Sequence, residues 1–144
     1  MTLPPLFALL AILGFTVSCE RSYTIEYVVP DGFSGILKLR AQARNGVKLV
    51  ETDGRIVLTF PRSGTLDVKG KLPMLEWHNP VARFANGTGI PMAGGPQAKV
   101  ADDVVALRGL GIKNNNTESW YLVGTARELP EAMKQFDGFR VPER

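Results

Sequence analysis

The chain has 144 residues, of which 44% are hydrophobic and 22% charged, and its formal net charge is +3 at pH 7. This composition is typical of a single globular domain and excludes disordered and collagen-like chains. The 17 Lys and Arg residues are scattered along the chain, whereas a surface that binds nucleic acid needs a clustered basic face. We therefore expect no nucleic-acid partner.

Residues 1–19 predict an export signal. Their apolar stretch runs from Leu6 to Phe15 and is too short for a membrane-spanning helix, which takes about 20 residues. The segment "TVSC" resembles the box that precedes the acylated cysteine of exported lipoproteins, and this resemblance implies lipid attachment at Cys19. The alternative is cleavage at the same bond by an ordinary signal peptidase, because Thr16 and Ser18 also fit the small-x-small pattern that precedes such a bond. Cys19 would then remain a lone thiol.

The first half of the remaining chain predicts short strands. Apolar and polar residues alternate in each of them, with β-branched and aromatic types enriched. Turn sequences rich in Gly, Pro, Asn and Asp lie between them, and the "RNG" turn at 44–46 predicts a hairpin whose return strand is 47–51. The predicted strands are residues 23–29, 36–42, 47–51, 55–60 and 65–70.

The second half predicts a long loop, further strands and a helix. Residues 79–99 are rich in Gly and Pro and predict a loop without regular structure, 100–114 predict one or two buried strands, and 119–125 predict an apolar strand. Thr125 and Glu128 have the spacing of a capping box.

Pro130 favours a helix that begins there, after a 3₁₀ turn. Leu129, Met133 and Phe136 then share one face of this helix, and Gly138 suits its end. The expected fold is mainly β: a single antiparallel β-sandwich or small barrel over residues 20–138, with one short C-terminal helix and a tail over 139–144.

Few residues predict chemistry. His78 is the only histidine of the chain, and a lone histidine is more often a hydrogen-bonded or exposed side chain than a catalyst. Asp102 and Asp103 would point to opposite faces of a strand. No set of four Cys or His suits zinc, and no phosphate-binding glycine motif is present. We expect no enzyme activity, metal or cofactor; a small hydrolase that uses His78 with an acid is the alternative.

Three aromatic residues are the candidates for ligand binding, namely Trp77, Trp120 and Tyr121. Together they would form a platform for sugar rings or for a partner surface. An aromatic residue on a strand is more often part of the core. The carbohydrate-binding hypothesis is therefore a second alternative.

Three groups of turn and cap residues form a pattern: Pro30, Gly32, Phe33 and Gly35, then Pro61 and Gly64, then Val123, Gly124 and Thr125. In this pattern the chain resembles an uncharacterised family of small bacterial exported or lipoprotein β domains. The resemblance implies a location in the cell envelope, lipid-anchored, periplasmic or secreted, and transfers no catalytic residue. We therefore expect a non-catalytic binding or structural module, tethered to a membrane by its N-terminal lipid, whose partner is an envelope protein or a glycan.

Overall fold

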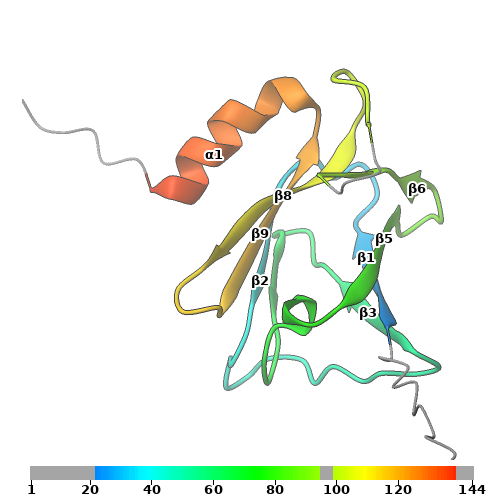
Figure 1. Ribbon diagram of the computed structural model, residues 1–144, viewed down its shortest axis with the longest axis vertical. Helices are drawn as coiled ribbons and strands as arrows, with labels where there is room; N and C mark the ends of the chain where they lie inside the picture. Colours follow the sequence, from blue (N-terminus) through cyan, green and yellow to red (C-terminus); the bar gives the residue numbers. More distant parts are fainter. Residues whose placement is uncertain (1–21, 95–98, 139–144) are drawn as a thin grey trace, which may run out of the picture.

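The computed structural model describes residues 22–94 and 99–138, whose strands form two separate sheets and whose chain ends in a short helix (Figure 1). The predicted mainly β class with one C-terminal helix is confirmed, in the form of two sheets and not of one closed barrel. The predicted signal segment with Cys19, and the tail over 139–144, lie outside the described residues.

The four-stranded sheet has the order β3-β1-β5-β6. Its central strand β1 alternates buried Ile25 and Tyr27, which face the other sheet, with Glu26 on the outer face. Both neighbours of β1 run parallel to it, and β6 is antiparallel to β5. The bounds of these strands are Tyr23–Val29 for β1, Arg55–Thr59 for β3, His78–Phe84 for β5 and Gly89–Ile90 for β6.

The five-stranded sheet has the order β4-β2-β9-β8-β7. Its three long strands are antiparallel, and the short strands at its two edges run parallel to their neighbours. A bulge between Gly109 and Gly111 interrupts the pairing of β8 with β9. The bounds are Gly35–Arg40 for β2, Thr65–Asp67 for β4, Met92–Ala93 for β7, Ala106–Lys113 for β8 and Glu118–Gly124 for β9.

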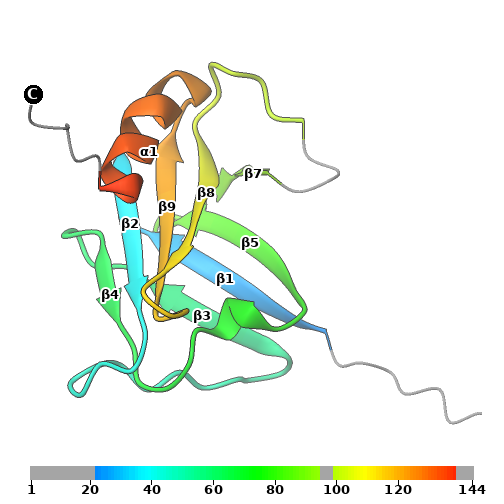
Figure 2. The same ribbon diagram turned by 60° about the vertical axis from the view of Figure 1, so that its left-hand side comes forward.

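The main core lies between the two sheets. Figure 2 shows that the strands of one sheet cross those of the other. Two twisted sheets that cross stay close along one diagonal and separate along the other, so this arrangement leaves room for a cleft at a corner. The fully buried side chains of the core include Ile25, Tyr27, Leu37, Leu39, Leu58, Leu107 and Val123.

The chain ends in a capped helix, as predicted. Thr125 and Glu128 form the capping box, followed by the 3₁₀ turn η2 (Ala126–Glu128) and by α1 (Leu129–Asp137). Gly138 ends the helix in the left-handed conformation, with φ 59°. The apolar face of α1 packs on the outer face of the five-stranded sheet (Figure 2).

The prediction of antiparallel pairing throughout is wrong for both sheets: β1 lies between two parallel neighbours, and the edge strands β4 and β7 run parallel to β2 and β8. The reason is that the first five strands alternate between the two sheets along the chain. Each turn carries the chain across to the other sheet, so successive strands of one sheet come back in the same direction. Turn sequences predict antiparallel neighbours only where both strands join the same sheet.

The predicted hairpin at Arg44–Gly46 is also wrong. The turn exists, because the Gly46 N–H donates to the Ala43 carbonyl at 3.0 Å. The chain then pairs at Val47 alone, in a parallel bridge to Val68, and 47–51 forms no strand. A Cβ atom on Gly46 would lie 2.5 Å from the Val68 carbonyl carbon. Gly46 is therefore required for a close backbone approach and not for a hairpin.

The prediction of a structureless loop over residues 79–99 is wrong as well, because β5, β6 and β7 lie within or overlap this range. Gly87 lies in the turn between β5 and β6 with φ 94°, and Gly94 follows β7 with φ 106°. Pro80 is tolerated inside β5. On one side it pairs with β1, and on the other side β6 reaches only Ala82 and Arg83, so this part of β5 has an open edge. A proline is tolerated at such an edge because it has no N–H to donate to a neighbouring strand.

Candidate functional site

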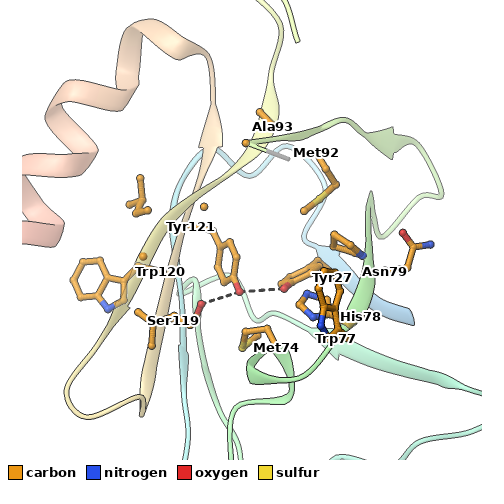
Figure 3. Close-up of a pocket in the computed structure, with 16 residues that line it drawn as sticks. Tyr27, Met74, Trp77, His78, Asn79, Met92, Ala93, Ser119, Trp120 and Tyr121 are labelled. Carbon is orange, nitrogen blue, oxygen red and sulfur yellow. Dashed lines mark hydrogen bonds between the residues drawn. The ribbon is translucent and has the colours of Figure 1, made fainter. Parts of the chain in front are cut away.

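A cleft with a volume of about 850 Å³ opens between the two sheets (Figure 3). One wall is Trp77 to Pro80, at the start of β5, and the other is Gly109 to Ile112, in the second half of β8. Met74 and Met92 lie at its two ends. The cleft thus occupies a corner at which the crossing sheets separate.

Three hydroxyl groups, one from β1 and two from β9, meet in the floor of the cleft. The Tyr27 and Tyr121 hydroxyl oxygens lie 3.0 Å apart, and Ser119 Oγ lies 2.8 Å from the same Tyr121 oxygen (Figure 3). The Tyr27 and Tyr121 rings pack edge to face, with centroids 5.1 Å apart. Tyr121 and Ser119 lie two residues apart on β9, so both side chains point into the space between the sheets. We call these three groups the hydroxyl floor.

Burial keeps both tyrosines of the hydroxyl floor neutral. Desolvation raises the pKa of Tyr27 far above its ordinary value, and the neighbouring Tyr121 hydroxyl raises it further. Desolvation also raises the pKa of Tyr121, although its hydrogen bonds to Ser119 and Tyr27 oppose this. The hydroxyl floor therefore offers neutral O–H groups and not phenolates.

The rim of the cleft is apolar and exposed. The Trp77 side chain is 82% exposed and Ile112 is 40% exposed, which is unusual for side chains of this size. His78 lies beside Trp77, and its Nδ1 lies 2.7 Å from the Glu76 carbonyl oxygen. A carbonyl oxygen only accepts, so Nδ1 is the donor in this hydrogen bond.

A missing side chain contributes to the space in the cleft. Gly109 pairs with Tyr121 and therefore faces the cleft, as Leu107 two residues earlier faces the core. A Cβ atom built on Gly109 would meet no heavy atom within 4 Å, and its φ lies outside the left-handed region. A larger residue at this position would fill the cleft without straining the backbone.

The lining of the cleft carries no Asp, Glu, Lys or Arg side chain among the residues that the structure describes. Over the same residues, no cluster of three or more His, Cys, Asp or Glu side chains is arranged to hold a metal ion. The cleft is thus suited to hydrogen bonding and apolar contact.

The structure separates the three aromatic residues singled out from the sequence. Trp77, Trp120 and Tyr121 all border the cleft, but the Trp120 ring lies on the opposite face of β9 (Figure 3). There it packs edge-on against Phe136 of α1, with ring centroids 5.8 Å apart. Trp120 and Tyr121 are consecutive in one strand, so they face opposite sides of the sheet and do not form one platform with Trp77.

The other candidate residues from the sequence lie at different places in the chain. His78 lines the cleft. Asp102 and Asp103 are both exposed in a turn before β8, not on a strand as considered above. Cys19 lies outside the described residues. None of the helices within the described residues is long and apolar enough to cross a membrane.

Sequence reasoning missed Tyr27, Ser119 and Gly109 as site residues. The two-residue period of each strand indicates that Ser119 and Tyr121 share a face, and that much was available from the sequence. The meeting of Tyr27 with Tyr121, 94 residues later, has no local signal, because it depends on how the two sheets pack.

No family model matches the chain, and no curated protein sequence matches it. Among solved structures it is similar to one described as a "Putative Lipoprotein from Bacillus anthracis", with 18% sequence identity and a TM-score of 0.40, over 84% of this chain and 83% of that chain.

Proposed function

We propose that this chain is a non-catalytic binding module of the cell envelope and that the cleft between β5 and β8 holds its ligand. The observation that supports this most strongly is the convergence of three hydroxyl groups at the floor of an apolar cleft of about 850 Å³. Small-molecule sites typically have volumes of about 300–1,000 Å³, mostly apolar walls and a few polar groups that orient the ligand.

The envelope location is proposed on the N-terminal sequence alone. The short apolar segment and the "TVSC" box support export and acylation at Cys19. We expect labelled palmitate to be incorporated in the parent protein and not in Cys19→Ser. Mass spectrometry that finds an unmodified Cys19 thiol and the initiator Met1 in the isolated protein would contradict this part of the proposal.

A larger side chain placed in the cleft tests whether the cleft is the ligand site. We expect native mass spectrometry of the protein isolated from its own host to show a retained small molecule in the parent and none in Gly109→Leu. Gly89→Leu is the matched control: a Cβ atom at Gly89, on β6, also meets no heavy atom within 4 Å, and Gly89 does not line the cleft. We expect Gly89→Leu to retain the same molecule.

Two results would reject the cleft as the ligand site. One is the same retained molecule in all three proteins, which would place its site elsewhere. The other is the absence of a retained molecule from the parent and both variants. Circular dichroism of each variant checks that the fold is kept.

The exposure of Trp77 supports a second candidate function, in which a sugar ring stacks on the indole at the rim. An 82% exposed tryptophan offers an open aromatic face, and such faces bind the apolar side of sugars. We expect glycan binding to change the fluorescence of the parent and to leave Trp77→Ala unchanged. If a panel of glycans leaves the parent fluorescence unaltered, this candidate is rejected.

The hydrolase alternative depends on His78, whose ring nitrogen Nδ1 is engaged by the Glu76 carbonyl. We expect His78→Ala to keep every activity that can be measured for the parent. A hydrolytic activity of the parent that this variant loses would favour the enzyme hypothesis over the binding module.

A further inference from the structure

We propose that the cleft takes an uncharged, largely apolar small molecule that carries a carbonyl or ether oxygen, and that the hydroxyl floor donates a hydrogen bond to this oxygen. The inference rests on the proposed function, because it assigns a ligand class to the same cleft. Two observations carry it: a count of protons in the hydroxyl floor, and the lack of Asp, Glu, Lys and Arg among the described residues that line the cleft.

The hydroxyl floor contains one more proton than its internal hydrogen bonds use. Tyr27, Tyr121 and Ser119 bring one O–H proton each, and two hydrogen bonds join the three groups. Each bond uses one proton, whichever oxygen donates. Among the described residues no other acceptor lies within hydrogen-bond distance of these hydroxyls. One O–H proton is therefore left for an acceptor that the protein does not supply.

The remaining O–H donor is buried, and the cleft is the route by which an acceptor can reach it. Tyr27 is 1% exposed and Tyr121 is 7% exposed, and a buried donor without an acceptor costs free energy. Both groups nevertheless line the cleft, so an oxygen that enters it can reach them. The raised pKa values of the two tyrosines keep the donor protonated over the physiological range.

The lining of the cleft disfavours an ionic ligand. No Lys or Arg among the described residues lines the cleft to balance an anion, and no Asp or Glu lines it to balance a cation. Burying an unpaired charge costs far more than burying an amide or a carbonyl. The apolar contacts come from Met74, Met92 and Ile112, and the Trp77 indole adds an aromatic face at the rim.

The test uses prodan, an uncharged naphthalene that carries a ketone and an amine and whose emission shifts to longer wavelength when its carbonyl accepts a hydrogen bond. We expect saturable binding to the purified protein with hydrogen-bonded emission. We also expect weaker binding of 2-dimethylaminonaphthalene, which lacks the ketone, and of the anionic anilinonaphthalene sulfonate. Equal binding of all three probes would overturn the proposed ligand class.

Two variants test the position of the probe and its hydrogen bond. Gly109→Leu fills the cleft, and we expect its prodan dissociation constant to rise at least about tenfold, by loss of contact area, while Gly89→Leu keeps the parent value. The double variant Tyr27→Phe with Tyr121→Phe removes two of the three hydroxyls. We expect it to lose about threefold to tenfold in affinity for prodan and to shift the bound emission to shorter wavelength.

The outcomes separate this inference from the proposed function. If Gly109→Leu abolishes retention of the native molecule while prodan fails to bind the parent, the ligand class is wrong and the binding function stands. If prodan binds but Gly109→Leu binds it equally well, prodan does not occupy the cleft and the proposed ligand class fails, whereas retention of the native molecule still decides the binding function. Should the double variant not fold, the comparison of the three probes on the parent still decides the ligand class.

Discussion

The outer faces of the two sheets differ in what covers them. On the five-stranded sheet, Leu110, Trp120 and Leu122 form an apolar surface that α1 covers with its own apolar face (Figure 2). α1, the one α-helix of the described residues, contacts β8 and β9 of the five-stranded sheet, and Figures 1 and 2 show no α-helix over the outer face of the four-stranded sheet. There Glu26 is only 8% exposed, because its carboxylate forms ion pairs with Arg83 and Arg55 from the two flanking strands.

The contrast shows two ways to protect a sheet face. An apolar face needs a second layer, and the amphipathic helix supplies it. A polar face protects itself, because the stems of long arginine side chains lie over the strand while their charged ends satisfy a carboxylate. The Trp120 indole has both kinds of cover. It packs on α1, and in addition Lys113 Nζ and Lys38 Nζ lie 3.9 Å and 4.0 Å from its ring centroid.

The largest expected effect concerns the helix-covered face. We expect Trp120→Ala to lower the free energy of unfolding by about 3–5 kcal/mol, because it leaves a cavity between β9 and α1. The matched control is Trp77→Ala, which removes an exposed indole and should change stability by less than about 0.5 kcal/mol. Urea denaturation measures both. Equal losses in the two variants would show that the helix does not depend on this packing.

The self-covered face should be less sensitive. We expect Glu26→Gln to cost about 1–3 kcal/mol, since it removes the charge that two arginines share, although these arginines are partly exposed. Asp67→Asn, in the exposed pair with Arg40 at 2.6 Å, should cost less than about 1 kcal/mol. If Asp67→Asn proves the more damaging of the two, the carboxylate of Glu26 does not organise its face.

The stability difference between the parent and Glu26→Gln should depend on pH. Hydrogen bonds from Arg83 and then Arg55 lower the pKa of Glu26 below its ordinary value. The contribution of Glu26 to stability is therefore complete above the unfolded pKa of about 4.3 and is lost as the pH falls through the lower folded pKa. We expect the difference in Tm between the parent and Glu26→Gln to be constant from about pH 7 to 5 and to shrink in more acidic buffer. A difference that grows on acidification would have the wrong sign.

The attachment of the helix offers a smaller test. Glu128 Oε2 accepts the Thr125 N–H at 2.7 Å and the Thr125 hydroxyl at 3.1 Å. We expect Glu128→Ala to cost about 1 kcal/mol. Glu128→Gln keeps an acceptor and should cost less. Thermal denaturation followed by circular dichroism distinguishes them, and identical melting curves would contradict a role for the capping box.

The smallest effect is expected at the uncovered edge of the four-stranded sheet. Val57 on β3 is 45% exposed and has no helix over it. We expect Val57→Thr to change the free energy of unfolding by no more than about 0.5 kcal/mol, because the side chain keeps its shape and loses little burial. A loss above about 2 kcal/mol would show that a further layer covers this face.

The local elements follow from local sequence. The alternation in 23–29 predicts β1 with its observed bounds, and the Asp53-Gly54 turn has the positive φ values of 52° and 72° that such a pair favours. The capping box at Thr125 and the left-handed Gly138 set the ends of the helical segment. Each of these features depends on residues that are close together in the sequence, so it can be predicted without knowing how the two sheets pack.

Pairing and the site depend on tertiary structure. The sequence determines that Trp120 and Tyr121 face opposite sides of β9, because successive side chains in a strand alternate. Only the packing of two layers decides that Tyr121 turns inward to Tyr27 and that Trp120 turns outward to α1. The parallel neighbours of β1, the cleft and its hydroxyl floor all arise because the chain crosses between the sheets, and the free energy that selects this crossing comes from contacts between residues far apart in sequence.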